Sequence, residues 1–221
     1  MTINDELLNQ IDATLGAGIQ PNLTTASAVS DIFEVYVFSL VVRAAETEGA
    51  TVAFYDVHGQ SANTFIFRTS PGHLWSSTQP YTYALLSFPA KELLEAHLGV
   101  RVAGKSHVLH ELDVCVLTHA EAETCRRNQV PPRSSQVLIA VECKFYTSLL
   151  SLELARAFIG LELDIGAQDT LFVTNTSSPS VERLLTARNR QWDHNIIPSS
   201  QVNVDRLRNT FQLAFKNFKA R

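Results

Sequence analysis

The chain has 221 residues, which is enough to bury one sizeable hydrophobic core and favours a single domain over two. Hydrophobic residues make up 45% of the chain and charged residues 18%, and there is no low-complexity tract, so a disordered tail is excluded. The formal net charge is -4, so binding to nucleic acid would depend on local basic patches and not on a global attraction.

The cysteines and the N-terminal residues bear on where the protein works. Cys115, Cys125 and Cys143 show no CxxC or Cys/His ligand spacing, so a structural zinc site is not expected. The N-terminal residues lack the basic start and the apolar stretch of a signal peptide, and no run approaches the roughly 20 apolar residues of a membrane helix. We therefore expect reduced thiols in a cytoplasmic protein that is not attached to a membrane.

The first half of the chain is expected to contain one central helix and several strands. Residues 1–26 indicate a short helix followed by a polar lead-in. Residues 30–49 carry apolar side chains on every face before a Gly49 stop, which predicts a largely buried helix. Further along, the pattern predicts strands at 51–57, 63–69 and 81–88 and a short helix from Pro89 to Gly99.

The second half is expected to alternate strands and helices. Strands are predicted at 100–103, 107–117, 137–146 and 169–175, helices at 148–166, 178–189 and 204–221, and a polar loop at 119–136. This order predicts a single α/β domain over residues 1–221, with a mixed central β-sheet flanked by helices. We expect its core at about residues 27–175 and a C-terminal helical extension at 176–221.

Two charged residues end the otherwise apolar strand at 137–146. Side chains alternate along a strand, so Glu142 and Lys144 are expected on one side and Cys143 on the other. Charges at the edge of an apolar element are costly unless they are paired, solvated or bound to a ligand. This position therefore needs either a salt-bridge partner or a function.

Another acid, Asp113, lies inside the preceding apolar strand. The period of two places Glu111, Asp113 and Cys115 on one face. If the two strands are neighbours, the carboxylates of Asp113 and Glu142 converge, and Lys144 lies one step beyond. Two carboxylates suit Mg²⁺, for which Mn²⁺ can substitute. The lysine could orient or deprotonate a metal-bound water or neutralise charge in a phosphoryl transition state, so the arrangement predicts phosphodiester cleavage.

Asp113, followed on the next strand by Glu142-x-Lys144, resembles the PD-(D/E)xK nuclease superfamily, in its restriction-endonuclease-like and Mrr-like branches. The core of that superfamily is a helix, three strands, a helix and a strand, and the resemblance covers roughly residues 30–175. Leu112 stands where the motif has proline, which is not a ligand. The resemblance implies a restriction-endonuclease-like core in which Asp113 and Glu142 bind metal and Lys144 is catalytic.

The same superfamily often supplies a further acid from its first helix. Glu34 is our candidate for this catalytic and metal-binding role, because it lies among apolar residues where an unpaired carboxylate is costly. The alternative is a capping box in which Glu34 pairs with the helix start at Asp31. Glu46, near the other end of the helix, is expected to be solvated. Glu111 is expected to contact the metal ligands without binding the metal itself, or else to pair with Lys105.

Four arginines are candidate contacts to a nucleic-acid backbone, and an exposed salt bridge or a solvated helix end is the alternative. They are Arg156, on the helix after the lysine strand, and Arg183, Arg188 and Arg190, near the end of the next helix. The expected partner is nucleic acid, with DNA preferred. A homodimer or a partner protein is also considered, because the last helix has an apolar stripe at Leu207, Phe211, Phe215 and Phe218, which core packing explains equally well.

Together these features predict a divalent-metal-dependent nuclease of a restriction, defence or repair type. The rival interpretation is a nuclease-like fold with an inactive metal site that serves as a nucleic-acid or protein binding module, because a fold does not fix a function. A small-molecule α/β enzyme is disfavoured, since the chain has no Gly-rich phosphate loop, no GxSxG elbow and no Cys-His constellation.

Overall fold

The computed structural model describes residues 2–16, 19–68 and 70–221. In chain order the helices and strands are α1 (Ile3–Leu15), β1 (Gln20–Pro21), α2 (Val29–Thr47), β2 (Thr51–Asp56), β3 (Thr64–Phe65), β4 (Thr82–Ser87), β5 (Leu94–Ala103), β6 (Leu109–Thr118), α3 (His119–Asn128), β7 (Val137–Lys144), α4 (Leu152–Ile165), β8 (Asp169–Thr174), α5 (Pro179–Ala187), β9 (Trp192–Asp193) and α6 (Gln201–Ala220). A short 3₁₀ turn at Ser134–Gln136 leads into β7.

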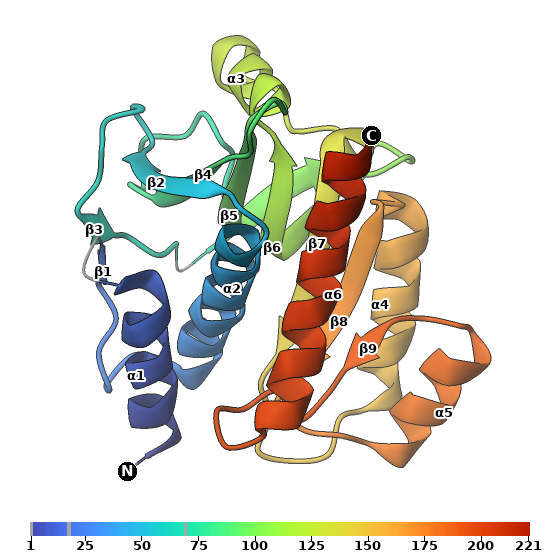
Figure 1. Ribbon diagram of the computed structural model, residues 1–221. Coiled ribbons are helices and arrows are strands. Elements are labelled where there is room, and N and C mark those ends of the chain that lie inside the picture. The colour runs from blue at the N-terminus through green and yellow to red at the C-terminus, as the bar shows by residue number, and fades with distance from the viewer. Residues whose placement is uncertain (1, 17–18, 69) are drawn as a thin grey trace.

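Seven strands form one central sheet in the order β2-β4-β5-β6-β7-β8-β9, and β1 and β3 form a separate pair. Neighbours from β2 to β7 run antiparallel, whereas β7, β8 and β9 run parallel. Parallel neighbours need a crossover connection, which α4 and α5 provide. Figure 1 shows α2 and α6 on one side of the sheet and α4 and α5 beside β8 and β9. The predicted α/β class with a mixed sheet flanked by helices is confirmed.

Helix α2 lies at the centre of the main hydrophobic core, as its apolar sequence predicts. Its buried side chains point to all sides because α1, α6 and the sheet surround it. The helix begins after Ala28 with no side-chain hydrogen bond at its N-cap, so the capping box from Asp31 to Glu34, which was the alternative role for Glu34, does not form. Beyond the helix, Gly49 has a φ of 94°, a left-handed conformation that suits glycine.

Helix α6 belongs to the same core and is not a separate extension. Its apolar stripe, at Leu207, Phe211, Phe215 and Phe218, is buried together with residues of α2 and the sheet. Core packing therefore accounts for the stripe, and this face is not free to contact another copy. Although α2 and α6 are the longest helices, no helix in the described part of the chain is both long and apolar enough to cross a membrane.

The prediction of a helix from Pro89 to Gly99 is wrong. This segment contains the first half of β5, in which Leu94, Ala96 and Leu98 alternate into the main core with the period of a strand. Cross-strand pairing with β4 and β6 overrides the helix propensity of its glutamates and leucines.

The prediction of a loop at 119–136 is also partly wrong, because this segment contains α3. Thr118 caps this helix by accepting a hydrogen bond from the Glu121 amide at 3.3 Å. The helix is polar and presents only a narrow buried face at Glu121, Ala122 and Cys125, so its apolar periodicity is weak.

The remaining elements agree with the expected order, with small differences. The strand expected at 63–69 is reduced to β3, and Thr69 lies outside the described residues. The short helix expected within residues 1–26 is α1, with Met1, Ala17 and Gly18 outside the described residues. Strand β9 was not predicted, because two residues are too few for a period to show.

Candidate active site

Strands β6 and β7 separate near one end of the sheet, and this opening holds the candidate site. Their pairing ends at Val114 and Val141, before β7 itself ends. Just beyond this pair, the backbone amide of Cys143 donates to Oδ2 of Asp113 at 2.6 Å. The Asp113 carboxylate thus replaces a strand carbonyl as acceptor, which satisfies the amide where the strands diverge.

The expected strict alternation along β6 is wrong around Asp113. Leu112 and Cys115 both pack in a second hydrophobic core under α4, whereas Val114 packs in the main core. On the neighbouring strand, Gly99 lies across from Asp113 and has a φ of 58°. This left-handed conformation disfavours any residue with a Cβ, and it changes the direction of β5 at the level where the β6 pattern breaks.

Glu142 and Lys144 lie at the end of β7 and line a cleft of about 290 Å³, together with Asp113. Nζ of Lys144 lies 2.7 Å from Oε1 of Glu142 and 3.6 Å from Oδ2 of Asp113. Phe158 and Leu161 of α4 form an apolar wall of the same cleft. The structure therefore brings together the three residues that strand pairing was expected to place side by side.

The charged groups of this cleft influence one another strongly. Burial raises the pKa of Asp113, although the Lys144 ammonium and the Cys143 amide act against this. Burial, and then the charge of Asp113, raise the pKa of Glu142. For Lys144, burial disfavours the ammonium, but the carboxylates of Asp113 and Glu142 outweigh that effect and raise its pKa. The two carboxylates therefore favour the protonated form of Lys144 at neutral pH.

Helix α2 contributes Glu34 to the same electrostatic cluster. Burial, and then the charges of Asp113 and Asp31, raise the pKa of Glu34 to about 9. No hydrogen bond or ion pair to its carboxylate is found in residues 2–16, 19–68 and 70–221. Glu46, near the other end of α2, is exposed and pairs with Arg43 at 3.2 Å. The structure thus places Glu34, and not Glu46, within electrostatic reach of Asp113.

Glu111 and His110 lie at the rim of the cleft. Burial, and then the charge of Asp113, raise the pKa of Glu111. Its alternative partner, Lys105, instead donates to a backbone carbonyl of α4 at 3.2 Å, so the pair with Glu111 is not present. Nε2 of His110 lies 2.6 Å from Oδ2 of Asp164, which satisfies the ring without a metal.

The four arginines that were candidate contacts do not form one surface. Arg156 is exposed on α4, next in sequence to the residues that line the cleft. Arg183 and Arg188 are exposed on α5 and at its end. Arg190 pairs with Glu162, with Nε and Oε2 2.9 Å apart, so its charge is already balanced. Of these four, Arg156 is the one placed beside the cleft.

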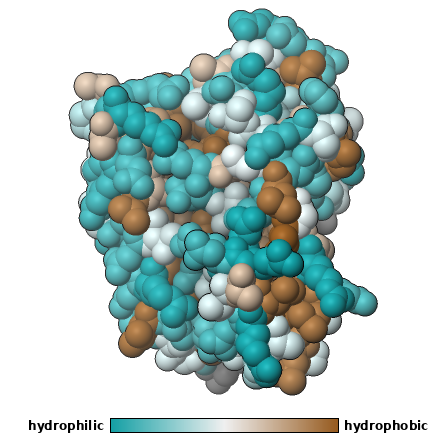
Figure 2. Space-filling model, turned by 90° about the vertical axis from the view of Figure 1, so that its right-hand side faces the viewer, coloured by the Kyte–Doolittle hydropathy of each residue, from teal (hydrophilic) through white to brown (hydrophobic). Residues whose placement is uncertain are grey.

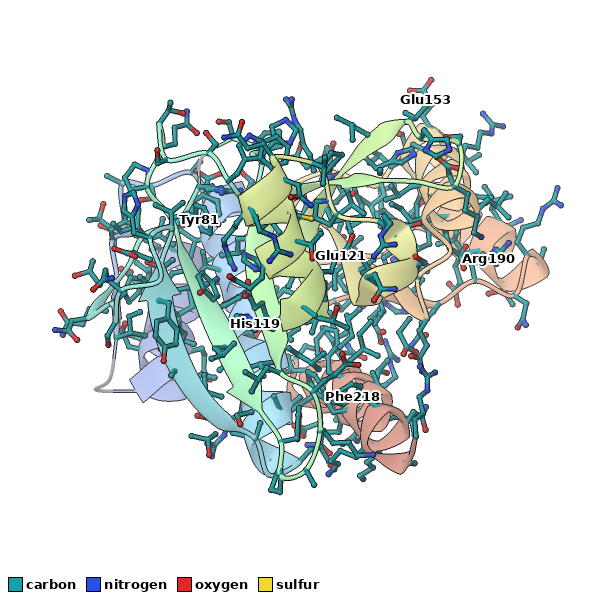
Figure 3. The ribbon with its side chains drawn as sticks, turned by 90° about the horizontal axis from the view of Figure 1, so that it is seen from above. Tyr81, His119, Glu121, Glu153, Arg190 and Phe218 are labelled. Atoms are coloured by element: carbon teal, nitrogen blue, oxygen red, sulfur yellow. The ribbon has the colours of Figure 1, made fainter. Side chains whose placement is uncertain are left out.

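The sequence did not reveal a second group of ionisable residues, formed by Glu95 of β5 with His119 and Glu123 of α3. Its ligand atoms are close enough to surround an ion, and Figure 3 shows His119 where α3 meets the sheet. However, Arg126 donates to both carboxylate oxygens of the fully buried Glu95. Burial opposes ionisation of Glu95, but hydrogen bonds from His119, His97 and Arg126 outweigh it and lower the pKa. A metal would have to displace the guanidinium, so this group fits an internal ion pair better.

Comparisons of the chain with protein-family models, with curated proteins and with solved structures give no match. The fold itself defines an α/β protein with a mixed sheet. A function must therefore be argued from the chemistry of the cleft.

Proposed function

We propose that this protein is a divalent-metal-dependent nuclease with a restriction-endonuclease-like core, which cleaves phosphodiester bonds, with DNA as the preferred substrate, in restriction, defence or repair. The observation that carries the proposal is the convergence of Asp113, Glu142 and Lys144 where β6 and β7 separate. The element order gives further support. Helix α2 precedes the adjacent strands β5, β6 and β7, and α4 then leads to β8, which pairs with β7.

The donor set of the cleft fits Mg²⁺, with Mn²⁺ as a substitute. Asp113 and Glu142 line the cleft and offer carboxylate oxygens, which hard divalent cations prefer, and Glu34 lies outside that lining but within electrostatic reach of Asp113. With Glu111, four carboxylates face the single ammonium of Lys144, a net charge of -3 if all are ionised. The pKa values of all four acids are raised, first by burial, and for Glu34, Glu111 and Glu142 then by the charge of Asp113. Asp113, Glu142 and Glu34 would hold the metal.

The residues of the chain have distinct roles in this proposal. The metal, when bound, supplies Lewis acidity towards the phosphate. Lys144 is protonated, so its ammonium can donate to a phosphate oxygen and stabilise negative charge in the transition state. The Cys143 amide fixes the Asp113 carboxylate, and the wall at Phe158 excludes water from one side, which strengthens these interactions.

Substitutions at the three converging residues test the proposal. We expect Asp113→Ala, Glu142→Ala and Lys144→Ala each to lower Mg²⁺-dependent DNA cleavage by at least about 100-fold, because each removes a group that acts on the phosphate or the metal. The circular dichroism spectra of Glu142→Ala and Lys144→Ala should match the wild type, since these side chains lie at a cleft, and Asp113→Asn, which keeps an acceptor for the Cys143 amide, replaces Asp113→Ala if that protein does not fold. Lys216→Ala removes an exposed lysine of α6 and should cut at the wild-type rate. Wild-type cutting by the folded Lys144→Ala protein would refute the mechanism.

A different result would favour the rival interpretation. If the wild-type protein binds nucleic acid but does not cut it with Mg²⁺ or Mn²⁺, the fold is a binding module whose metal site is inactive.

A further inference from the structure

Within the loop at residues 70–81, which precedes β4, Gly72 is held against the second half of β5. The Gly72 amide donates to the carbonyl of Gly99 at 2.9 Å, and the Arg101 amide donates to the carbonyl of Gly72 at 3.1 Å. Gly72 therefore lies beside β5 as a continuation of the sheet. The loop has a defined position relative to the cleft, because Gly99 lies across from Asp113.

Two buried side chains hold the same loop from inside the protein. The hydroxyl of Tyr81 donates to the carbonyl of Leu74 at 2.6 Å, and Nη2 of Arg68 donates to the carbonyl of His73 at 2.9 Å. The guanidinium of Arg68 lies 3.6 Å from the centre of the Tyr81 ring. Figure 3 shows Tyr81 on the same side of the molecule as His119. These contacts hold residues 73 and 74 in place, so little conformational entropy is left to lose when a ligand binds the loop.

The loop presents two stacked rings and a cation. His73 and Trp75 are half-buried, with ring centres 4.1 Å apart and planes at 17°. Burial, and then the charges of Arg101 and Arg68, lower the pKa of His73, so its ring is neutral at pH 7. Arg101 is exposed, and within the described ranges its side chain forms no ion pair. Aromatic rings beside a positive charge are the elements that bind single-stranded nucleic acid.

The stacked rings of His73 and Trp75 are close enough to the cleft to contact the same strand of substrate. Arg101 of β5 pairs in register with Glu111 of β6, at the cleft rim. Gly72 lies one strand further out. Neighbouring strands are about 4.8 Å apart, so the loop lies about 10 Å from β6. A single strand of about three nucleotides covers that distance even when its bases stay stacked at about 3.4 Å per step.

We infer that His73 and Trp75 form a stacking platform for an unpaired nucleobase, with Arg101 contacting the phosphate next to it, so that the substrate is single-stranded near the cut bond. This inference rests on the proposed nuclease function and names the form of its substrate. A base can stack on these rings only when it is outside a duplex, which is why the rings favour single-stranded nucleic acid over a fully paired one.

Tryptophan fluorescence tests the platform directly, because the chain has two tryptophans, Trp75 and Trp192. Short oligothymidylate, added in Ca²⁺ to the Lys144→Ala protein to prevent cutting, should quench the fluorescence in a saturable way. The quenching should disappear in Trp75→Phe and persist in Trp192→Phe. Trp192 lies in β9 at the edge of the sheet, where its indole N–H donates to the hydroxyl of Thr174. Quenching that is absent, or that persists in Trp75→Phe, would overturn the inference.

Affinity for the same oligonucleotide gives a second measurement. Trp75→Ala should weaken binding about five- to 150-fold, as loss of one stacked base predicts. Arg101→Ala should weaken it about two- to tenfold and reduce its salt dependence, because one phosphate contact is lost. Arg127→Ala, an exposed arginine of α3, is the matched control and should bind like the wild type.

The results also separate this inference from the nuclease proposal. Wild-type affinity for oligothymidylate in folded Trp75→Ala and Arg101→Ala proteins refutes the platform even if Mg²⁺-dependent cutting is observed. Should Trp75→Ala fail to fold, the fluorescence comparison of the two phenylalanine variants still decides. Quenching through Trp75 without any cutting supports the platform and refutes the nuclease proposal.

Discussion

Glu34 carries a carboxyl group whose pKa is raised to about 9 by burial and by the charges of Asp113 and Asp31. A bound divalent cation would relieve this accumulation of charge, so Glu34→Gln should weaken the affinity for Mg²⁺ about tenfold. Isothermal titration with Mg²⁺ measures the effect. Glu46→Gln is the matched control on the same helix, because it removes only an exposed ion pair with Arg43. Equal metal affinity in the two variants would remove Glu34 from the site.

At the scale of residues, the sequence allowed part of the site to be predicted. The order of the strands, together with alternation along β7, was enough to expect Asp113, Glu142 and Lys144 side by side, although the alternation expected along β6 fails around Asp113. The acceptor role of Asp113 towards the Cys143 amide was not predictable, because a pattern does not show where two strands stop pairing. The left-handed Gly99 opposite Asp113 was missed for the same reason. Its signal was a glycine between apolar strand residues, which marks a bulge or a close approach of backbone.

At the scale of elements, α3 is held to β5 by a network that depends on pH. The hydrogen bond that His119 donates to Glu95, and the charges of Glu95 and Glu123, raise the pKa of His119, against the effects of burial and Arg126. The stability that protonated His119 contributes is present below its ordinary pKa of 6.5 and is lost as the pH rises through the raised value. The melting temperature of the wild type should therefore fall from about pH 6 to pH 9 by on the order of 2 °C more than that of His119→Gln. Parallel pH profiles of the two proteins would contradict this account.

The elements themselves were predictable where apolar periods are strong. Helix α6 follows from a clear apolar period, and helix α2 and strands β6, β7 and β8 follow from apolar runs of the right length that are buried on more than one face. Strand β5 was mistaken for a helix in its first half, since the choice depends on pairing with β4 and β6, which lie elsewhere in the chain. The Glu95 network was missed with it, because Glu95 lies in that half of β5 and its partners lie in α3.

At the scale of the whole molecule, charge should limit how the protein holds a polyanion. The net charge is -4, and nine of the 18 lysines and arginines are already in ion pairs with acids. Figure 2 shows hydrophobic residues in separate patches between polar ones on the right-hand face of Figure 1, so that face offers no single broad apolar area either. Binding should therefore depend on a few local cations and on metal ions that bridge to phosphate.

A salt titration measures the number of phosphate contacts. The slope of log affinity against log salt is about -0.9 per phosphate on duplex DNA, so a slope that corresponds to about two to five contacts is expected. Ca²⁺ should strengthen duplex binding by the Lys144→Ala protein relative to a chelator. A slope near -10, or an affinity that does not depend on metal, would mean that a broad basic surface binds the nucleic acid.

The location of a bound metal tests the central claim most directly. Crystals soaked in Mn²⁺ contain an anomalous scatterer that identifies the metal without assuming any activity. The account predicts a peak between the carboxylates of Asp113 and Glu142, within reach of Glu34, and none at Glu95, where Arg126 already binds both oxygens. A peak at Glu95, His119 and Glu123 alone, or no peak in the cleft at saturating Mn²⁺, would contradict it.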